Sequence, residues 1–525
     1  MLHKGIKVVK KVVKWFFVFL IFLLFFLAQV INLGTSWAKT NYNYSSFDEI
    51  LYTLGTSVTT ASEGVLEEFF QSNVFPPLKI TLCILVVFLI IYILYRIMFK
   101  NSTILLNLQL FRKKFSIKIN LIVLTLCTFS IFSLFTLGNS ISYAMDELYI
   151  NEYLDANTKT SSFFEKEYVH PKDVSLKWPK KKRNLIYIFL ESMESTYADT
   201  EHGGAFDVNY IPELTDLAED NTNFSSTEDV GGATMLTGSS WTMGGIVAET
   251  AGIPIKNVFG PNSEQSYENG LVNGAWSLGD ILKKEGYHQS IMVGSDLEFG
   301  GRKAYFSGHG NFDIYDYYTA IDEDVIDDDY YVFWGLEDNK LFDWAKDELE
   351  KLSEEEEPFN FMMLTVDTHA PDGYTDDSCE NKYDDKYLNS IACSSEQVAE
   401  FIEWIQDQDF YDNTTIVLTG DHISMNNYSF DDIPKDYERG VYNVYINSLV
   451  DTDNNKNREF STFDYYPTTL ASLGVKIKGN RLGLGTNLFS NKKTLSEKYG
   501  SSHVNEELKK KSLYYDSCIN FNQCK

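Results

Sequence analysis

The sequence predicts an α/β fold in two parts: three N-terminal transmembrane helices, then a domain with a central, mostly parallel sheet flanked by helices. Two observations carry this prediction. Apolar residues concentrate in the first quarter of the 525-residue chain, whereas the acidic excess lies almost wholly after Tyr143. From Asn184 onward, short apolar runs alternate with segments of helical periodicity, which is typical of a parallel sheet covered by helices. The two parts therefore suit different solvents.

Three stretches are long and apolar enough to cross a hydrocarbon core roughly 30 Å thick. They are Trp15 to Leu33, Leu78 to Tyr95 and Ile119 to Leu137. A cleaved signal peptide is the alternative for the first stretch, but its apolar run is longer than a usual signal segment and two more spans follow. We therefore expect residues 1–138 to form a membrane domain with three transmembrane helices.

The distribution of charge predicts the orientation of these helices. Cations precede the first span and fill the segment between the second and third, whereas the loop from Gly34 to Pro77 has Lys39 as its only cation. Because positive charge marks the cytoplasmic side, the N-terminus is expected in the cytoplasm and everything after the third span outside it. The two cationic clusters are Lys4, Lys7, Lys10, Lys11 and Lys14, and Arg96, Lys100, Arg112, Lys113, Lys114 and Lys118.

Within the outer loop, residues 44–70 mix aromatic, small and acidic side chains without a clean period. Such a segment either lies on the membrane surface or folds as a loop, and the sequence leaves both open.

The cysteines indicate an oxidising compartment. Cys379 with Cys393, and Cys518 with Cys524, are close pairs on the expected outer side, and no C-x-x-C metal spacing occurs. Structural disulfides are the better interpretation of both pairs. Cys83 and Cys127 lie within the spans, where we expect them to be inert apolar side chains.

The net charge of −29 argues against nucleic acid as a partner, because nucleic-acid binding needs a basic surface. It does not exclude a phosphate substrate, since a metal ion can supply local positive charge.

The outer region is expected to begin with a polar connector at residues 139–182. The extracytoplasmic domain follows at residues 183–490, with a C-terminal tail at 491–525. A capping-box pattern at Ser394 and Gln397 predicts the start of a helix. The predicted strands are Leu185 to Leu190, Gln289 to Val293, Phe359 to Val366, Thr414 to Thr419 and Val441 to Ile446, and the other predicted helices are Leu278 to Lys284 and Tyr465 to Leu473.

Three of these strands run directly into carboxylate or imidazole side chains. In open α/β sheets, sites assemble just beyond the carboxyl ends of the strands. Glu191, Asp421 and His422 would offer a divalent cation two oxygen ligands and one nitrogen ligand. Manganese or magnesium fits that mixture, and zinc is possible. Asp367 and His369 follow the third strand end.

A metal site of this kind can activate a hydroxyl as a nucleophile. Residues 238–245, G-S-S-W-T-M-G-G, supply hydroxyls at the start of a predicted helix, where backbone N–H groups and the helix dipole favour an anion. An ordinary serine or threonine N-cap is the alternative interpretation.

Five motifs in order resemble the lipoteichoic-acid-synthase-like branch of the alkaline phosphatase and sulfatase superfamily, and are most similar to its phosphoglycerol transferases. The resemblance covers about residues 183–490. The motifs are N-L-I-Y-I-F-L-E-S at 184–192, W-T-M-G-G-I-V-A at 241–248 with G-I-P at 252–254, T-V-D-T-H-A-P-D-G at 365–373, D-H-I-S-M-N-N at 421–427 and L-G-L-G at 482–485.

This resemblance implies that Glu191, Thr242, Asp421 and His422 are metal ligands, that Thr242 is also the catalytic nucleophile, and that His369 contacts the substrate phosphoryl group. It also implies that Arg302 binds substrate, with Asp296 as a weaker candidate. The tryptophan that lipoteichoic acid synthases carry shortly before this arginine is replaced here by glycine.

The resemblance further implies a bacterial inner-membrane enzyme with a periplasmic catalytic domain. It would move a glycerophosphoryl group from phosphatidylglycerol to a glycan acceptor, for example in periplasmic glucan biosynthesis, through a covalent threonine intermediate. Alternatives on the same scaffold are a phosphoethanolamine transferase, a phosphodiesterase or sulfatase-type hydrolase, and a non-catalytic membrane binding protein. The C-x-P-x-R and S-x-P-x-R motifs of sulfatase nucleophiles do not occur in the sequence.

Overall fold

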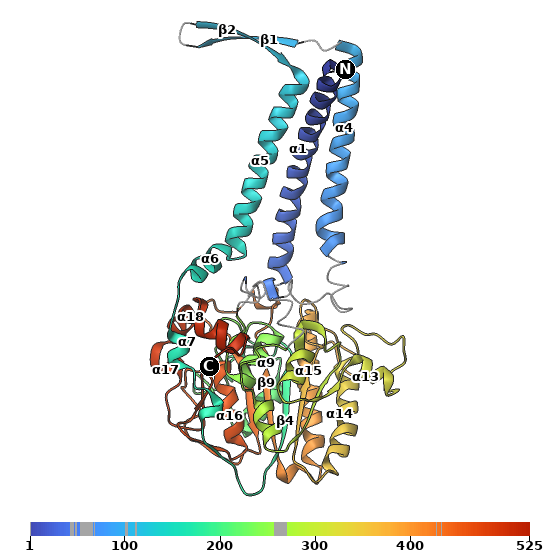
Figure 1. Ribbon diagram of the computed structural model, residues 1–525. Coiled ribbons are helices and arrows are strands. Elements are labelled where there is room, and N and C mark those ends of the chain that lie inside the picture. Colours follow the sequence, from blue (N-terminus) through green and yellow to red (C-terminus); the bar gives the residue numbers. More distant parts are fainter. Residues whose placement is uncertain are drawn as a thin grey trace. The chain divides into compact units, whose positions relative to one another are not determined.

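The structure is a computed structural model that describes residues 2–41, 47, 50–52, 67, 69–99, 103–110, 113–256, 270–426, 428–431 and 433–524 (Figure 1). The chain forms two compact units, one of residues 1–40 and 63–151 and the other of residues 41–62 and 152–525. The predicted surface segment or loop at residues 44–70 lies largely outside the described residues.

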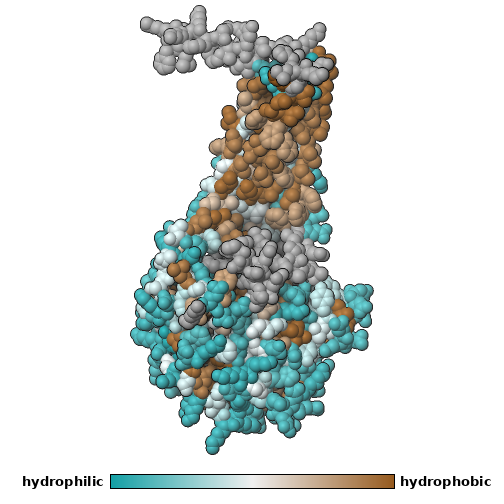
Figure 2. All heavy atoms as spheres, viewed as in Figure 1, coloured by the Kyte–Doolittle hydropathy of each residue, from teal (hydrophilic) through white to brown (hydrophobic). Residues whose placement is uncertain are grey.

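The first unit contains three long apolar helices, α1 (Leu2–Asn41), α4 (Phe75–Phe99) and α5 (Leu121–Glu147). Their apolar windows have mean hydropathies of 2.7, 2.7 and 2.2, and each is long enough to cross a membrane. Most of their large apolar side chains are exposed, as a lipid-facing surface requires. Figure 2 shows this apolar surface in brown. The prediction of three spans is confirmed.

A hairpin separates the second and third of these helices. Strands β1 (Thr103–Leu110) and β2 (Lys113–Asn120) pair antiparallel. The third helix therefore begins at Leu121 rather than at Ile119, and the Asn120 side chain caps it by accepting a hydrogen bond from the Ile122 N–H (3.0 Å).

The second unit is built on a seven-stranded sheet with the order β5-β10-β9-β4-β8-β6-β7. The central strands β9, β4, β8, β6 and β7 are parallel, and β10 lies antiparallel to β9. The mostly parallel sheet predicted from the sequence is thus confirmed. The strands are β4 (Asn184–Leu190), β5 (Gly232–Ala233), β6 (His288–Val293), β7 (Asp313–Tyr315), β8 (Phe359–Leu364), β9 (Thr414–Gly420) and β10 (Val441–Ile446).

Helices cover both faces of this sheet, which explains why β4 is buried along its whole length. Its residues alternate between two apolar cores: Tyr187 and Phe189 face one core, and Ile186 and Ile188 face the other. The first core contains side chains from α9 (Thr242–Ala251), α11 (Leu278–Lys284), α12 (Arg302–Gly308), α16 (Tyr465–Ser472), α17 (Leu495–Tyr499) and α18 (Ser501–Lys509). The second contains side chains from α8 (Pro212–Asp220), α13 (Tyr317–Asp322), α14 (Asp338–Ser353) and α15 (Lys386–Gln406).

The predicted helix start at Ser394 and Gln397 is wrong. Both residues lie inside α15, which begins at Lys386 and is capped by the Asp385 side chain. The apolar face of this helix extends back to Leu388 and Ile391, so core packing overrides the local capping pattern. Similarly, the strand expected to reach Val366 ends at Leu364.

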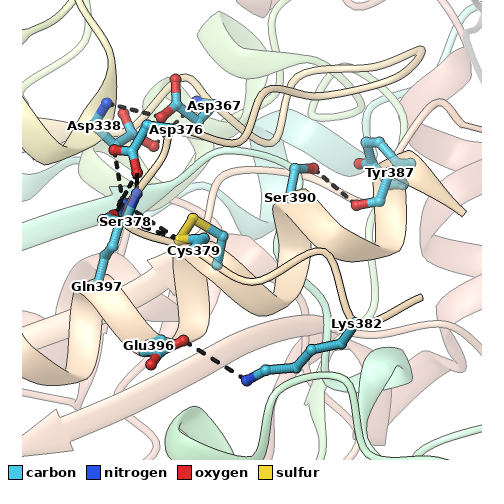
Figure 3. Close-up of a disulfide and its surroundings, with 11 residues drawn as sticks. Asp338, Asp367, Asp376, Ser378, Cys379, Lys382, Tyr387, Ser390, Glu396 and Gln397 are labelled. Atoms are coloured by element: carbon cyan, nitrogen blue, oxygen red, sulfur yellow. Dashed lines mark hydrogen bonds and ion pairs between the residues drawn. A yellow bond between two sulfur atoms is a disulfide. The ribbon is translucent and has the colours of Figure 1, made fainter. Parts of the chain in front are cut away.

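Both predicted cysteine pairs are joined as disulfides, Cys379 with Cys393 and Cys518 with Cys524. Figure 3 shows how the first ties the loop before α15 to that helix. The Gln397 amide donates to Asp376 of the same loop (3.3 Å), which adds a polar contact beside the disulfide.

Candidate metal centre and nucleophile

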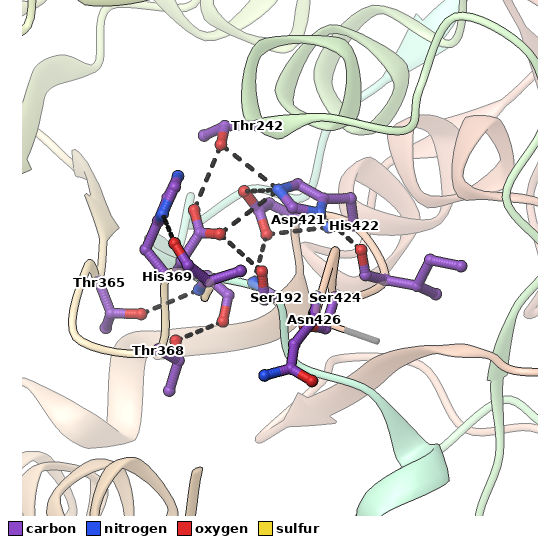
Figure 4. A network of polar contacts seen from close by, with 12 residues as sticks. Ser192, Thr242, Thr365, Thr368, His369, Asp421, His422, Ser424 and Asn426 are labelled. Atoms are coloured by element: carbon purple, nitrogen blue, oxygen red, sulfur yellow. Dashed lines mark hydrogen bonds and ion pairs between the residues drawn. The ribbon is translucent and has the colours of Figure 1, made fainter. Parts of the chain in front are cut away.

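The carboxyl ends of β4 and β9 and the first residue of α9 bring four side chains together (Figure 4). The Thr242 hydroxyl lies 3.2 Å from Glu191 Oε2 and 3.5 Å from His422 Nε2. His422 Nε2 lies 3.4 Å from Glu191 Oε1 and 3.5 Å from Asp421 Oδ2. The side chains that sequence reasoning assigned to a metal and a nucleophile therefore converge on one point.

These residues fit a divalent cation. The ligand atoms of Glu191, Asp421 and His422 all lie within 4.8 Å of one another, and all three residues are buried. Within the described part of the chain, the buried Asp421 Oδ2 has no hydrogen-bond partner. A buried carboxylate oxygen without a partner is costly, and a metal ion would satisfy it. Two carboxylates and one imidazole suit manganese, magnesium or zinc.

The electrostatics of the site are those of a cation site. Burial opposes the charged form of all three groups, but the carboxylates of Asp421 and Glu191 raise the pKa of His422 to about 10. Burial and then the negative charge of Glu191 raise the pKa of Asp421 to about 7. Burial would raise the pKa of Glu191 too, yet His422 holds it well below its ordinary value. The negative charge of the two carboxylates therefore exceeds the positive charge that the His422 imidazole can supply.

One glycine lets α9 approach the candidate metal ligands closely. A Cβ atom at Gly245 would lie 1.9 Å from the Asp421 carbonyl oxygen. Because only glycine fits against the Asp421 main chain, the start of this helix, with Thr242, lies directly over the ligand loop.

The turn after β4 is strained and strongly hydrogen bonded. Ser192 has φ 54°, its N–H donates to Asp421 Oδ1 (2.8 Å), and its hydroxyl donates to Glu191 Oε1 (2.7 Å). The Thr365 hydroxyl accepts from the Glu191 N–H (3.0 Å). Sequence reasoning assigned no role to Ser192 or Thr365, although their places beside strand ends were a usable signal.

His369 lies in the loop after β8. Its Nδ1 is 2.7 Å from the Ala370 carbonyl, which can only accept, so Nδ1 carries the proton and Nε2 is left for substrate. Figure 4 labels this side chain in the same group as Thr242, Asp421 and His422. Its ring packs on Trp334, with ring centroids 4.7 Å apart.

A pair of buried aspartates that the sequence did not reveal holds this loop. Asp338 accepts hydrogen bonds from the N–H groups of Val366 (2.8 Å) and Asp367 (3.0 Å), and the Asp338 N–H donates to Asp367 Oδ2 (2.9 Å). Burial, followed by the charge of Asp338, raises the pKa of Asp367 to about 9. These hydrogen bonds thus fix the main chain at Asp367, two residues before His369.

Arg302 is buried without an ion-pair partner among the described residues. Its Nη2 donates to the Asp296 carbonyl (2.6 Å) and to the Ser295 hydroxyl (3.2 Å), and Nε donates to the Phe299 carbonyl (3.0 Å). Burial lowers its pKa to about 10, and Glu191 and Asp421 are among the carboxylates that favour its charge. The Asp296 carboxylate caps its own loop by accepting a hydrogen bond from the Glu298 N–H (2.8 Å).

Tyr52, from the segment between α1 and α4, lies close to the same region. Its hydroxyl donates to the Gly300 carbonyl (2.6 Å), and its ring lies 5.3 Å from that of Trp241, the residue before Thr242. No periodicity in the surrounding sequence pointed to this contact.

Comparison with known proteins shows what the whole chain is similar to. Phosphoglycerol transferase I of Salmonella choleraesuis is 32% identical over 335 residues, covering 63% of this chain and 42% of the relative. The protein of the same name from Escherichia coli strain 55989 is 32% identical over 325 residues, covering 61% of this chain and 40% of the relative. The aligned part thus spans about two fifths of the length of these relatives.

Among solved structures, the lipoteichoic acid synthase LtaP of Listeria monocytogenes matches with 20% identity and a TM-score of 0.46, over 61% of this chain and 79% of that one. The phosphoethanolamine transferase EptA of Neisseria meningitidis matches with 14% identity and a TM-score of 0.47, over 87% and 84%. The Sulfatase family model matches residues 183–475, more than half of the chain. The chain belongs to the sulfatase family.

Proposed function

We propose that the protein is a metal-dependent, membrane-bound phosphoglycerol transferase that moves a glycerophosphoryl group from phosphatidylglycerol to a glycan through Thr242. The observation that carries the proposal is the Thr242 hydroxyl at the start of α9, 3.2 Å from Glu191 Oε2 and beside the buried Asp421 and His422. The name shared by the relatives, phosphoglycerol transferase I, supports this choice of substrate.

Glu191, Asp421, His422 and Thr242 would hold the cation. When bound, a divalent ion such as Mn²⁺ or Mg²⁺ neutralises phosphoryl charge and lowers the pKa of a neighbouring hydroxyl. The Thr242 oxygen then attacks phosphorus, diacylglycerol leaves, and a glycerophosphoryl-threonine forms. A sugar hydroxyl takes the group from the enzyme in the second step.

His369 and Arg302 complete the proposed site. Arg302 is a buried cation whose Nη1 makes no hydrogen bond with any described residue, so it is suited to pair with a phosphate oxygen. His369 Nε2 is the free ring nitrogen and is suited to carry a proton between the reacting oxygens. Asp296 would act on Arg302 through the loop they share rather than on the metal.

The catalytic unit is proposed to face the outside of a bacterial inner membrane. The cationic segments at residues 4–14 and 96–118 mark the cytoplasmic ends of the helices. The disulfide between Cys379 and Cys393 suits an oxidising compartment such as the periplasm.

The test is release of diacylglycerol from fluorescent phosphatidylglycerol by the purified full-length protein with Mn²⁺. Thr242→Ala should abolish release, whereas Thr242→Ser, which keeps the hydroxyl, should retain measurable turnover. Turnover of phosphatidylethanolamine in place of phosphatidylglycerol would instead identify a phosphoethanolamine transferase. Undiminished release by Thr242→Ala would remove the covalent mechanism.

A further inference from the structure

A set of aromatic side chains, in two groups that residues 331–334 connect along the chain, begins at Trp334 beside His369 and is not needed for the chemistry described above. We call it the aromatic strip. Trp334 packs on His369 with ring centroids 4.7 Å apart, and Phe333 stacks on Tyr374 at 6.2 Å. Tyr317 contacts Tyr331 (5.6 Å) and Tyr318 (5.3 Å). Its members are Tyr317, Tyr318, Tyr331, Phe333, Trp334 and Tyr374.

A tight turn presents the centre of the strip. The N–H of Val332 donates to the Gly335 carbonyl (2.6 Å) and the Gly335 N–H donates back to Val332 (2.9 Å), so Phe333 and Trp334 occupy the tip. Phe333 has φ 54°, a conformation that a bulky residue rarely adopts. Such strain persists where the surrounding structure fixes it, and it clusters at ligand-binding sites.

The turn is anchored to the loop between β6 and α12, the helix that begins at Arg302. The Leu336 N–H donates to the Gly294 carbonyl (2.9 Å), and Gly335 forms a bridge with Ser295, whose hydroxyl accepts from Arg302. The same element therefore fixes the strip relative to the residues proposed to bind phosphate.

The outer members of the strip are open to solvent. Tyr331 is 56% exposed and Tyr318 is 42% exposed, whereas Phe333, Trp334 and Tyr374 are half-buried. A run of exposed large rings on a soluble domain usually marks a binding surface. Tyrosine and tryptophan offer a ligand an apolar face and a polar edge at once.

The charge around the strip decides between ligand classes. Exposed carboxylates flank it at residues 327–329, at Asp372 and at Asp377. Such a surface repels phosphate groups and anionic lipids, yet carboxylate oxygens accept hydrogen bonds from sugar hydroxyls. Aromatic rings with carboxylates beside them therefore match a neutral polyhydroxyl chain, whose C–H faces can lie on the rings.

We propose that the aromatic strip is the binding site for a neutral glycan acceptor. The proposal rests on the proposed transferase function and adds where its second substrate binds. A sugar ring beside Trp334 presents a hydroxyl toward His369 and the glycerophosphoryl group on Thr242. The sugar oxygen forms a bond to phosphorus, the bond from phosphorus to the Thr242 oxygen breaks, and His369 Nε2 passes the hydroxyl proton to that oxygen.

The test compares full-length wild-type protein with the double variant Tyr318→Ala/Tyr331→Ala. The matched control is Phe521→Ala, which removes another exposed ring (41% exposed) outside the strip. The acceptors are maltohexaose, cellohexaose and laminarihexaose. Binding is followed by saturation-transfer NMR, transfer by mass spectrometry of the oligosaccharide, and the first step by diacylglycerol release without acceptor.

We expect the double variant to raise the KM for an accepted oligosaccharide at least tenfold and to lose its NMR signal, with diacylglycerol release within twofold of wild type. Phe521→Ala should match wild type throughout. If phosphatidylglycerol is cleaved but no oligosaccharide binds, or if the double variant binds as wild type does, the strip is not the acceptor site. Oligosaccharide binding that depends on the strip without any phosphatidylglycerol cleavage would keep the site and overturn the proposed function.

Discussion

Replacing Gly245 with alanine tests whether the helix that carries Thr242 must rest directly on the main chain of Asp421. The new Cβ would lie 1.9 Å from the Asp421 carbonyl oxygen, whereas ordinary contacts begin at 3.4 Å. The helix or the loop must therefore move by about 1.5 Å, the difference between these two distances. Thr242 belongs to the same first turn, so its 3.2 Å contact with Glu191 would be lost.

A displacement of about 1 Å in a catalytic geometry can cost on the order of 100-fold in rate. We expect the kcat/KM for diacylglycerol release to fall at least that far, which corresponds to ~2.7 kcal/mol of transition-state stabilisation. The Gly308→Ala variant is the matched control, because a Cβ there meets nothing within 4 Å. It should change activity less than twofold.

A loss of activity caused by unfolding must be distinguished from one caused by displacement of Thr242. Near-ultraviolet circular dichroism and the melting temperature of each variant make that distinction. A folded Gly245→Ala protein with wild-type activity would refute the claim that this close approach places the nucleophile.

Three other predictions follow from the charges and cross-links of the catalytic unit. His422 is protonated in the metal-free site (pKa about 10), but an imidazole that binds a metal must be neutral. Mn²⁺ binding should therefore release protons and weaken as pH falls. Calorimetry in buffers of different ionisation enthalpy measures this proton release. Burial raises the pKa of Asp367 from 3.8 to about 9, so its contribution to stability is complete below pH 3.8 and is lost as pH rises through 9. The Asp367→Asn variant should therefore show a smaller fall in unfolding free energy between pH 6 and pH 9 in urea titrations. Replacing Cys379 and Cys393 with serine opens a loop with a sequence separation of 14 and should lower the unfolding free energy by about 3 kcal/mol.

Each of these has a result that would contradict it. Metal affinity independent of pH would mean that His422 is already neutral. A steeper pH dependence in Asp367→Asn would mean that this carboxyl is charged in the native state. Equal urea midpoints with and without the cross-link would show that the loop before α15 is held by its other contacts alone.

The clustering of Glu191, Asp421 and His422 was predictable because these residues follow buried strands. The apolar runs before Glu191 and Asp421 identify parallel strands, and parallel strands deliver their carboxyl ends to one edge of a sheet. The assignment of Thr242 as a candidate nucleophile needed the family resemblance, since a threonine at a helix start is otherwise indistinguishable from a cap.

The supporting residues were not predictable for a different reason. Asp338, at the start of α14, accepts a hydrogen bond from the N–H of Val366, which lies 28 residues later in the chain. This contact holds the loop that carries His369. Ser192 has a positive φ, and Trp334 follows Phe333, which also has one. The spacing of apolar residues in the sequence does not predict such turn conformations. The predicted start of α15 at Ser394 was wrong because burial of the helical turns before Ser394 outweighs the local capping pattern.

The segment after residue 475 bears on how a soluble fragment of the protein could be produced. Leu495, Val504, Leu508 and Ile519 all belong to the larger apolar core, although they follow the region matched by the family model. The Tyr515 hydroxyl also donates to the Pro254 carbonyl (2.6 Å), close to the end of α9. A truncated fragment cut at the family boundary would expose this core and aggregate, so secretion and crystallisation trials should retain the chain through residue 524.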